Sequence, residues 1–369
     1  MKHALILSCV MLLLMCPRPS NGGTHPVFTT LPSAAAHSLA NMGISEIHAT
    51  SYTSNPATLA LSGDDGVATA SYSPGYRSSD SRDLSFSSAF FGTSATIPKG
   101  SDTEPAATVF GLAYYFTHFG YGEFARTDEV GNLLGTIEPY LRSHNLVLSA
   151  SRRGAINASI GVTVRHWRTE LVGQGAGSAT VAVTATATAF DFGSHLSRSF
   201  RLASGKSNSL WFVTPAVAAT YHNLGSDFDF SDSSADRDLP TMFRLAAEVA
   251  IERRSPAITL LKVVPMFEWQ CLTPGRNESI YHLGGRIELM ETVYFRKGVF
   301  DDGYSEDDPA GTWGIALSTR GFTKERRHGA TTTDQGSFFD RLDLDLSYAP
   351  HSIRYSNASL LELALTFDL

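Results

Sequence analysis

Apolar and polar side chains alternate strictly along the C-terminal segment Leu361–Leu369, which reads L-E-L-A-L-T-F-D-L. A period of two places the two kinds of side chain on opposite faces of a β-strand. In a soluble β-sandwich, one face of such a strand would pack on a core. In an outer-membrane β-barrel, a strand of about 9–11 residues crosses the bilayer at a tilt. Leu365, Phe367 and Leu369 would then meet lipid and Glu362 the lumen, so we expect this stretch to be the closing strand.

The same period recurs in about 14–15 segments from Val67 onward, and no linker or second helical domain interrupts them. Ile156–Arg165 alternates between aliphatic and polar residues. In Leu342–Tyr348 the face opposite the leucines carries charges, which would point to bulk water in a sandwich and to a polar lumen in a barrel. The pattern therefore predicts an all-β chain. If the chain is a barrel, we expect a transmembrane antiparallel up-and-down β-barrel of about 14 strands.

Residues before Val67 follow a different pattern. Ala34–Ile47 is small and mildly amphipathic, and Asn55-Pro56-Ala57 comes soon after it. An Asn side chain caps free backbone amides, and Pro fits the first turn of a helix. We therefore expect a short N-terminal helical segment that packs against the barrel.

The first residues resemble a secretory signal peptide. A short basic start at Lys2 precedes the apolar run Ala4–Met15 and a small-residue exit at Ser20-Asn21-Gly22. A lipoprotein would use Cys16, but the bulky Met15 before it is unfavourable for processing. Because no later segment reaches the roughly 18 apolar residues of a helical span, the exported protein would enter a membrane only as a closed barrel.

Composition narrows the function classes. Charged residues make up 18% of the 369 residues, glycines number 31, and the formal net charge is −7. Low charge with many glycines suits many strands and turns, and an acidic chain is a poor partner for nucleic acid. After signal cleavage only Cys271 remains, so we expect no internal disulfide.

No motif in the sequence requires catalysis or a cofactor. The chain lacks H-E-x-x-H, C-x-x-C and G-x-S-x-G. Gly205-Lys206-Ser207 lacks the earlier glycine of a phosphate-binding loop, and Gly173–Gly177 has the wrong spacing for a dinucleotide fingerprint, so both are interpreted as turns. We therefore predict a non-enzymatic protein without catalytic, cofactor-binding or metal-binding residues.

Two alternatives concern ligands. The acidic loops Ser226–Asp238 and Asp301–Asp308 could offer carboxylates to Ca²⁺, although neither has the spacing of a defined calcium loop. Solvated loops are the preferred interpretation. His166, His222 and His282 are isolated on predicted strands, and we expect rim or lumen positions for them rather than roles as metal ligands.

Several short motifs resemble those of the PorV/PorQ family of outer-membrane proteins. Tyr121–Ile137 is similar to that family's hairpin, Ala189–Gly193 (A-F-D-F-G) to one of its strands, and His222–Gly225 and Leu239–Leu245 to a strand end and a strand opening. Ser54–Leu59 resembles the Asn-Pro-Ala element that FadL-type channels share more widely. The residues that carry the resemblance are Tyr121, Gly122, Thr127, Asp128, Glu129, Gly131, Asn132, Asn223, Leu224, Gly225, Leu239 and Pro240, together with Asn55, Pro56 and Ala57.

The chain also departs from the family pattern. Asn41–Ser45 replaces a glycine-rich opening, and Leu369 replaces a terminal aromatic residue. The resemblance implies a divergent barrel in the cell outer membrane, accessory to type IX protein secretion or to surface attachment of cargo. Its partners would be outer-membrane lipid, the translocon or attachment-complex proteins, and exported cargo. A FadL-like channel for passive uptake of hydrophobic or small molecules is the alternative.

The resemblance further implies a division of the chain into three parts. Residues 1–22 would be the signal peptide, residues 23–65 a plug-like segment built around Asn55, Pro56 and Ala57, and residues 66–369 the barrel. It assigns no catalytic residue.

Overall fold

The computed structural model describes residues 33–39, 42–48, 50–62, 67–73, 85–98, 107–174, 180–202, 210–230, 239–273, 279–301, 310–323, 342–353 and 356–368. The predicted signal peptide, the Gly205–Ser207 turn, Leu369 and most of the two acidic loops lie outside these residues. Within them, no helix is both long enough and apolar enough to span a membrane.

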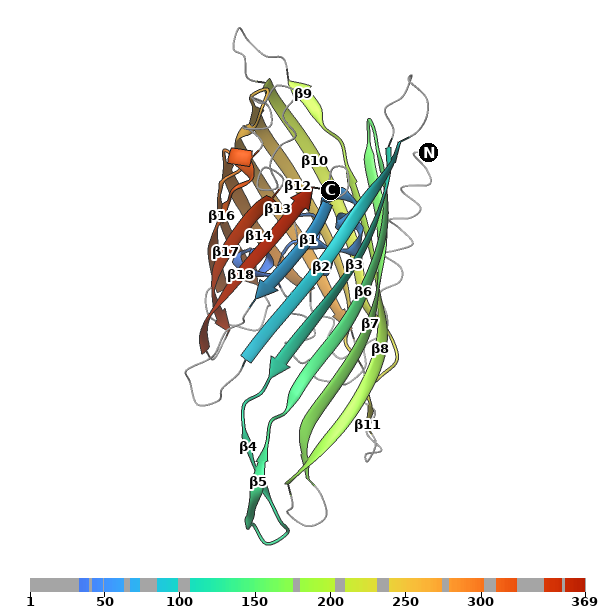
Figure 1. The fold of residues 1–369 in the computed structure, drawn as a ribbon, viewed down its shortest axis with the longest axis vertical. Helices are drawn as coiled ribbons and strands as arrows, with labels where there is room; N and C mark the ends of the chain where they lie inside the picture. The colour runs from blue at the N-terminus through green and yellow to red at the C-terminus, as the bar shows by residue number, and fades with distance from the viewer. Residues whose placement is uncertain are drawn as a thin grey trace.

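Antiparallel strands dominate the described chain (Figure 1). The strands of the barrel wall are β1 (Val67–Ser73), β2 (Ser85–Pro98), β3 (Ala107–Gly120), β6 (Tyr140–Arg153), β7 (Asn157–Gln174), β8 (Thr180–Ser197), β10 (Leu210–Gly225), β12 (Thr241–Arg254), β13 (Thr259–Thr273), β14 (Ser279–Leu289), β15 (Val293–Asp301), β16 (Ala310–Ser318), β17 (Leu342–Ile353) and β18 (Ser356–Asp368). Two short strands, β9 (Phe200–Leu202) and β11 (Asp229–Phe230), pair alongside them, and β4 (Phe124–Thr127) and β5 (Leu133–Ile137) form a separate hairpin.

Two pairings complete the wall, and the first of them joins the first and last wall strands in the sequence. β1 pairs with β18, where Ala68 lies opposite Phe367, and β8 pairs with β10, where Ala216 lies opposite Ser197. Each remaining wall strand pairs with its neighbour in the sheet order, so the described strands form a closed ring. The predicted antiparallel barrel of about 14 strands is confirmed. The predicted strands around Tyr121–Ile137 are an exception, because they pair with each other outside the wall.

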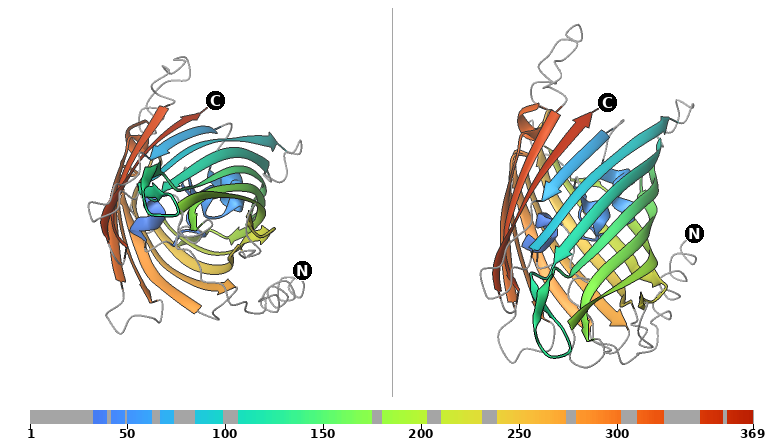
Figure 2. Two further views of the ribbon diagram at one scale, coloured as in Figure 1. Left: turned by 90° about the horizontal axis from the view of Figure 1, so that it is seen from below. Right: turned by 60° about the horizontal axis from the view of Figure 1, so that its bottom comes forward.

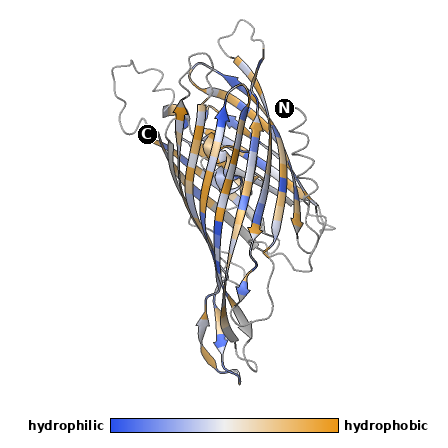
Figure 3. Cartoon of the chain, turned by 90° about the vertical axis from the view of Figure 1, so that its right-hand side faces the viewer, coloured by the Kyte–Doolittle hydropathy of each residue, from blue (hydrophilic) through white to orange (hydrophobic). Residues whose placement is uncertain are grey.

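Side-chain exposure follows the predicted alternation. In β18, Leu361, Leu363 and Leu365 are 40–41% exposed, whereas Glu362 and Ala364 are each 4% exposed. Apolar residues of this strand therefore face outward and polar residues inward. This is the reverse of a soluble protein and the arrangement expected of a barrel in lipid. Figure 3 shows hydrophobic and hydrophilic residues following one another along neighbouring strands.

The barrel has two distinguishable rims. Val67 pairs with Asp368, so the first and last wall strands share one rim, which we call the terminal rim. Short turns between β6 and β7, β12 and β13, and β14 and β15 lie at this rim. The opposite end, the distal rim, carries the end of β3 at Gly120, the start of β6 at Tyr140 and the β4–β5 hairpin between them.

One seam of the wall is only partly paired. β16 and β17 form backbone pairs from Ile315 opposite Tyr348 to Ser318 opposite Asp345, and the distal parts of both strands lack such pairs with each other. The short helix α2 (Ala34–Ser38) packs on the luminal side of these two strands. The wall at this seam is thus backed from inside by the N-terminal part of the chain.

The N-terminal residues 33–62, here called the luminal segment, lie inside the barrel (Figure 2). They comprise α2, two 3₁₀ turns, η2 (Ser51–Thr53) and η3 (Pro56–Thr58), and the one-turn helix α3 (Leu59–Ser62). The helix predicted near Asn55 forms as η3 and α3, but only Ala34–Ser38 of the predicted amphipathic stretch is helical. Tight turns suit this segment because it must reverse direction several times in a narrow lumen.

Candidate functional site

The luminal segment docks on glycines of the barrel wall. The Asn55 side chain caps η3 by accepting from the Ala57 amide at 3.0 Å, and its Nδ2 donates to the carbonyl of Ser194 at 3.1 Å. A Cβ atom at Gly193 would collide with the Asn55 carboxamide and would lie 2.8 Å from Pro56 Cδ. One at Gly161 would lie 2.6 Å from the Ala57 nitrogen. The Asn-Pro-Ala turn therefore fits only where two adjacent strands carry no side chain.

Other parts of the luminal segment also pack against glycines of the wall. A Cβ at Gly314 would collide with Ser38, one at Gly284 with Met42, and one at Gly111 would lie 2.6 Å from Leu59 Cγ. These glycines lie on three different strands of the wall, β16, β14 and β3. The wall is thus shaped to fit the segment along its whole course.

Glu46 forms the most deeply buried ionic contact of the luminal segment. It is fully buried and ion-paired with Arg286 on β14 and Arg296 on β15, and the Arg296 Nε lies 3.3 Å from its Oε1. Burial alone would raise the pKa of Glu46, but the guanidinium groups of Arg296 and Arg286 outweigh it and hold the pKa far below its ordinary value. The carboxylate is therefore charged at any physiological pH.

Three wall carboxylates bind the segment's polar groups from other sides. Glu362 on β18 accepts from the Ala34 amide and the Thr50 hydroxyl, each at 2.7 Å. Glu248 accepts from the Ser45 hydroxyl at 2.9 Å. Glu268, which is also ion-paired with Arg244, accepts from the Gly43 amide at 3.2 Å.

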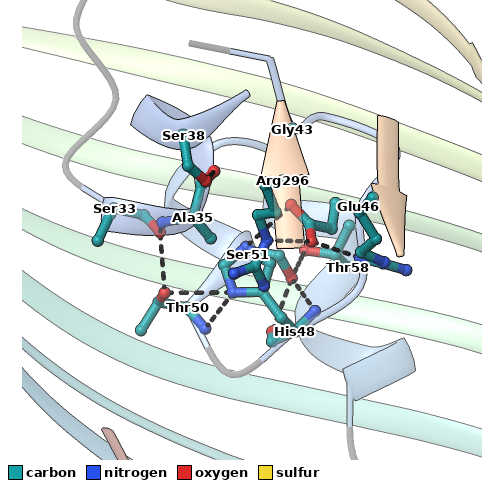
Figure 4. A network of polar contacts seen from close by, with 12 residues as sticks. Ser33, Ala35, Ser38, Gly43, Glu46, His48, Thr50, Ser51, Thr58 and Arg296 are labelled. Carbon is teal, nitrogen blue, oxygen red and sulfur yellow. Dashed lines mark hydrogen bonds and ion pairs between the residues drawn. The ribbon is translucent and has the colours of Figure 1, made fainter. Parts of the chain in front are cut away.

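Hydrogen bonds within the segment fix its turns, as Figure 4 shows. The Ser51 hydroxyl donates to the His48 carbonyl and the Thr58 hydroxyl, both at 2.9 Å. His48 also approaches Glu46, with 3.8 Å between Nε2 and the carboxylate. Burial lowers the pKa of His48. These hydrogen bonds give the luminal segment a defined conformation.

Several residues of the predicted family motifs lie close together on the barrel wall. Asp191, in the A-F-D-F-G strand, is ion-paired with Arg165, lies 3.4 Å from His222 and accepts from the Asn223 amide at 2.8 Å. Asn223 has a positive φ of 59° at a register shift in β10. A Cβ at the following Gly225 would collide with the neighbouring β8 backbone. The motif residues thus make a strand bend.

This bend also contacts the Leu-Pro opening of β12. The Asn223 Nδ2 donates to the Pro240 carbonyl at 3.0 Å, and Leu239 is buried, whereas Leu224 points outward. Asn223, Gly225, Leu239 and Pro240 therefore lie together. They do not meet the Asn55 turn directly.

An apolar layer fills the lumen at the distal rim. We call it the distal cluster; its main members are Phe86, Phe119, Leu141, Trp167, Phe228 and Leu239, with Tyr121 packed against it. All six are 9% exposed or less. They face inward from strand ends and from the β10–β12 connection, so the mouth of the lumen is lined with hydrocarbon and aromatic rings.

The Tyr121–Ile137 motif forms the β4–β5 hairpin beyond the distal rim. Gly122 and Gly131 have φ angles of 82° and 89°, which glycine adopts without strain. Asp128 accepts from the amides of Val130 at 3.0 Å and Asn132 at 2.7 Å. Thr127 ends β4 and Glu129 is exposed at the turn.

The closing-strand residues stand apart from all of these. Leu365 is exposed on the outer face, and Phe367 is half-buried between its partners Ala68 on β1 and Leu342 on β17. Among the predicted histidines, His222 and His282 face the lumen. His166 is exposed on the outer face, because its parity in β7 matches the apolar face, so of the predicted rim or lumen positions the lumen does not apply to it.

Apart from Glu362, which was expected in the lumen, the charged residues of the lumen were not predicted from the sequence. These are Glu46, Arg165, Asp191, Arg244, Glu248, Glu268, Arg286, Arg296 and Glu362. Their common signal is a charge on the inward parity of a strand or in the N-terminal segment. Among the described residues, no group of three His, Cys, Asp or Glu side chains could hold a metal ion.

Comparison with known proteins gives similarity in solved structures alone. No protein-family model and no curated protein matches the chain. The Pseudomonas putida toluene transporter TodX is similar over 95% of this chain and 99% of its own, with 9% identity and a TM-score of 0.46. A Pseudomonas aeruginosa FadL homologue covers 91% and 98%, with 12% identity and a TM-score of 0.40. The β domain of the Bordetella autotransporter BrkA covers 83% and 100%, with 10% identity and a TM-score of 0.44.

These similar structures are FadL-type barrels and autotransporter barrel domains. Because these proteins share so little sequence identity with the chain, their roles are not transferred to it. The functional argument therefore depends on the chain's own residues.

Proposed function

We propose that the protein is a non-enzymatic barrel of the cell outer membrane, exported through a cleaved signal peptide. The apolar outward face of β18 and its buried inward Glu362 support a lipid-facing wall around a polar interior. A closed ring of strands satisfies the backbone hydrogen bonds that lipid cannot.

Within that membrane, the geometry best supports a FadL-like route for passive uptake of hydrophobic small molecules. The observation that carries the proposal is the order of layers in the lumen. The apolar distal cluster lies at the distal mouth, and the luminal segment inside the barrel is held by ion pairs and hydrogen bonds; in this proposal the distal mouth faces outside and the segment acts as a plug. Apolar side chains at the mouth would attract hydrophobic molecules from water, and the plug would prevent a permanent aqueous leak.

Uptake by the purified full chain in liposomes tests this function. Toluene, or a fluorescent aliphatic alcohol, is added outside, and its arrival at an enclosed reporter is followed. We expect faster entry than into empty liposomes, and faster entry still for Glu46→Gln, which weakens the hold on the plug. Glu123→Gln, on the exposed edge of the β4–β5 hairpin, is the matched control. Entry equal to that of empty liposomes for every variant would remove the proposal.

A role of the PorV/PorQ type in type IX secretion or surface attachment is the second candidate. It is supported by the β4–β5 hairpin, in which Tyr121–Ile137 adopts the strand, Gly-Asn turn and return strand on which the resemblance rests. Deleting the gene and measuring export of type IX cargo tests this role. Unchanged secretion would count against it, and loss of secretion restored by the wild-type gene would favour it over uptake.

A further inference from the structure

The β4–β5 hairpin carries apolar side chains in an unusual place. It forms its own two-stranded sheet and extends past the distal rim, at the bottom of Figure 1. Val130 is 82% exposed, Leu133 69% and Leu134 59%. The hairpin lies past the paired ends of β3 and β6 and contacts the wall through β4 and β8. Its apolar side chains are thus exposed beyond the end of this part of the wall, where apolar exposure to water is unfavourable.

The tip of the hairpin is rigid. Asp128 receives three hydrogen bonds across the turn, from the Val130 amide at 3.0 Å and from the Asn132 amide and side chain at 2.7 Å each. The Asp128 amide donates to the Asn132 carbonyl at 2.9 Å. A turn fixed in this way presents its apolar residues in one conformation, which reduces the entropy lost on binding.

The apolar residues surround the tip. Leu133 and Leu134 are consecutive in β5 and so point to opposite faces of the ribbon, while Val130 lies at the turn between the strands. A flat partner could cover only one face. Covering all three residues requires a socket that encloses the tip.

The charges of the hairpin indicate which residues should surround the socket on a partner. Glu123, Glu129 and Glu138 are exposed on the hairpin, Asp128 lies at the turn, and the hairpin's one cationic side chain is Arg126. This acidic surround disfavours insertion into the anionic headgroups of a membrane surface and favours a basic protein surface. A charge at the rim of an apolar contact contributes mainly to the rate and specificity of binding.

We propose that the tip of the β4–β5 hairpin docks into an apolar socket with a basic rim on a partner protein at the distal side of the membrane. Val130, Leu133 and Leu134 fill the socket, and the surrounding carboxylates face its basic residues. The contact uses no residue of the luminal segment or of the distal cluster.

Site-specific photocrosslinking in cells tests the proposal. A photoreactive amino acid replaces Val130 in the full-length protein, and Ala155, exposed in a turn at the terminal rim, is the control position. We expect one protein adduct at 130 that is absent at 155, with the crosslinked partner peptide containing apolar residues beside Lys or Arg. Adducts with lipopolysaccharide alone, with a second copy of this chain, or with no protein would overturn the proposal.

Charge reversal then checks the complementarity. Glu129→Lys should reduce the yield of the adduct at 130 at least fivefold, and the reverse substitution of the partner's crosslinked basic residue should restore it. Heat-modifiable gel mobility of each variant confirms that the barrel is folded. If neither charge reversal changes the adduct yield, the proposed basic rim of the socket is contradicted.

Discussion

The two ends of the lumen are filled in opposite ways. Around the luminal segment, apolar clusters are accompanied by ionic and directional contacts, such as that between Glu46 and Arg286, which bind an element that comes from elsewhere in the sequence. At the distal rim, Phe119, Trp167 and their neighbours pack without direction. Ion pairs specify one docked position, because a misplaced charge stays unpaired, whereas an apolar layer tolerates rearrangement. The ion pairs and hydrogen bonds therefore specify the position of the luminal segment, whereas the distal cluster lines the mouth of the lumen.

The largest effect is expected from filling the glycine site below Asn55. Gly193→Val places a branched side chain where the Asn55 carboxamide and Pro56 now lie, so the Asn-Pro-Ala turn must leave the wall. We expect undocking of the luminal segment, seen as at least tenfold faster labelling of a cysteine placed at Ala57. Gly154→Val, with no atom near its Cβ, is the control. Unchanged labelling in Gly193→Val would contradict the docking geometry.

Removing the buried carboxylate should have the next largest effect. Glu46→Gln removes the carboxylate that is ion-paired with both Arg286 and Arg296, and loss of one partner costs about 3–5 kcal/mol in buried pairs. Hydrogen exchange of the segment's amides measures the loss of docking stability. A change below about 1 kcal/mol would show that water already screens the pair.

The same carboxylate predicts how docking depends on pH. Because the pKa of Glu46 is lowered in the folded state, its contribution is present above the ordinary carboxyl pKa and is lost only as pH falls through the lowered value. Docking should therefore be unchanged between about pH 8 and pH 5. Hydrogen exchange corrected for intrinsic rates measures this. A steep loss of protection near pH 6 would indicate a histidine as the controlling group.

A charge on the lipid face should destabilise the wall by an intermediate amount. Leu363→Arg, outward-facing in β18, should cost about 2–4 kcal/mol near the bilayer midplane and lower the yield of folded barrel. Heat-modifiable mobility in membranes reports assembly. Thr366→Arg, on the opposite parity, is the control and should assemble better; equal defects would mean that the two faces of the strand are misassigned.

The smallest effect is expected in the distal cluster. Leu141→Ala removes apolar contacts in a layer that water can enter from the rim, so we expect about 2 kcal/mol, the low end for a buried leucine. Denaturant unfolding in lipid measures it. The luminal segment should stay docked, with unchanged labelling of a cysteine at Ala57, which separates the two layers; undocking by this substitution would show that they act as one.

The local pattern of the chain predicted much of the wall. Alternation predicted the exposed face of Leu361, Leu363 and Leu365, because a strand's parity is set by adjacent residues alone. The Asn55 cap and the Gly131-Asn132 turn are likewise short-range features. That these strands close a ring depends on pairs such as Ala68 with Phe367, which no local pattern specifies.

The contents of the lumen were much less predictable. Glu46 and Arg286 are 240 residues apart in the sequence, and one sequence alone gives no signal that joins them. Glycines that admit the Asn-Pro-Ala turn, such as Gly193, resemble ordinary strand glycines until the turn is placed beside them. The hairpin was predicted as a strand pair, but its position outside the wall follows from the register of β3 with β6, which bypasses it.

We expect the luminal segment to form a fixed plug inside the barrel. Hydrogen exchange of the full chain in lipid nanodiscs measures this most directly. Amides of Thr53–Thr58 should be protected to the same degree as those of the central wall strand β13, and Gly193→Val should abolish that protection while leaving β13 unchanged. Rapid exchange of these amides in the wild-type protein, at the rate of an exposed loop, would contradict the account.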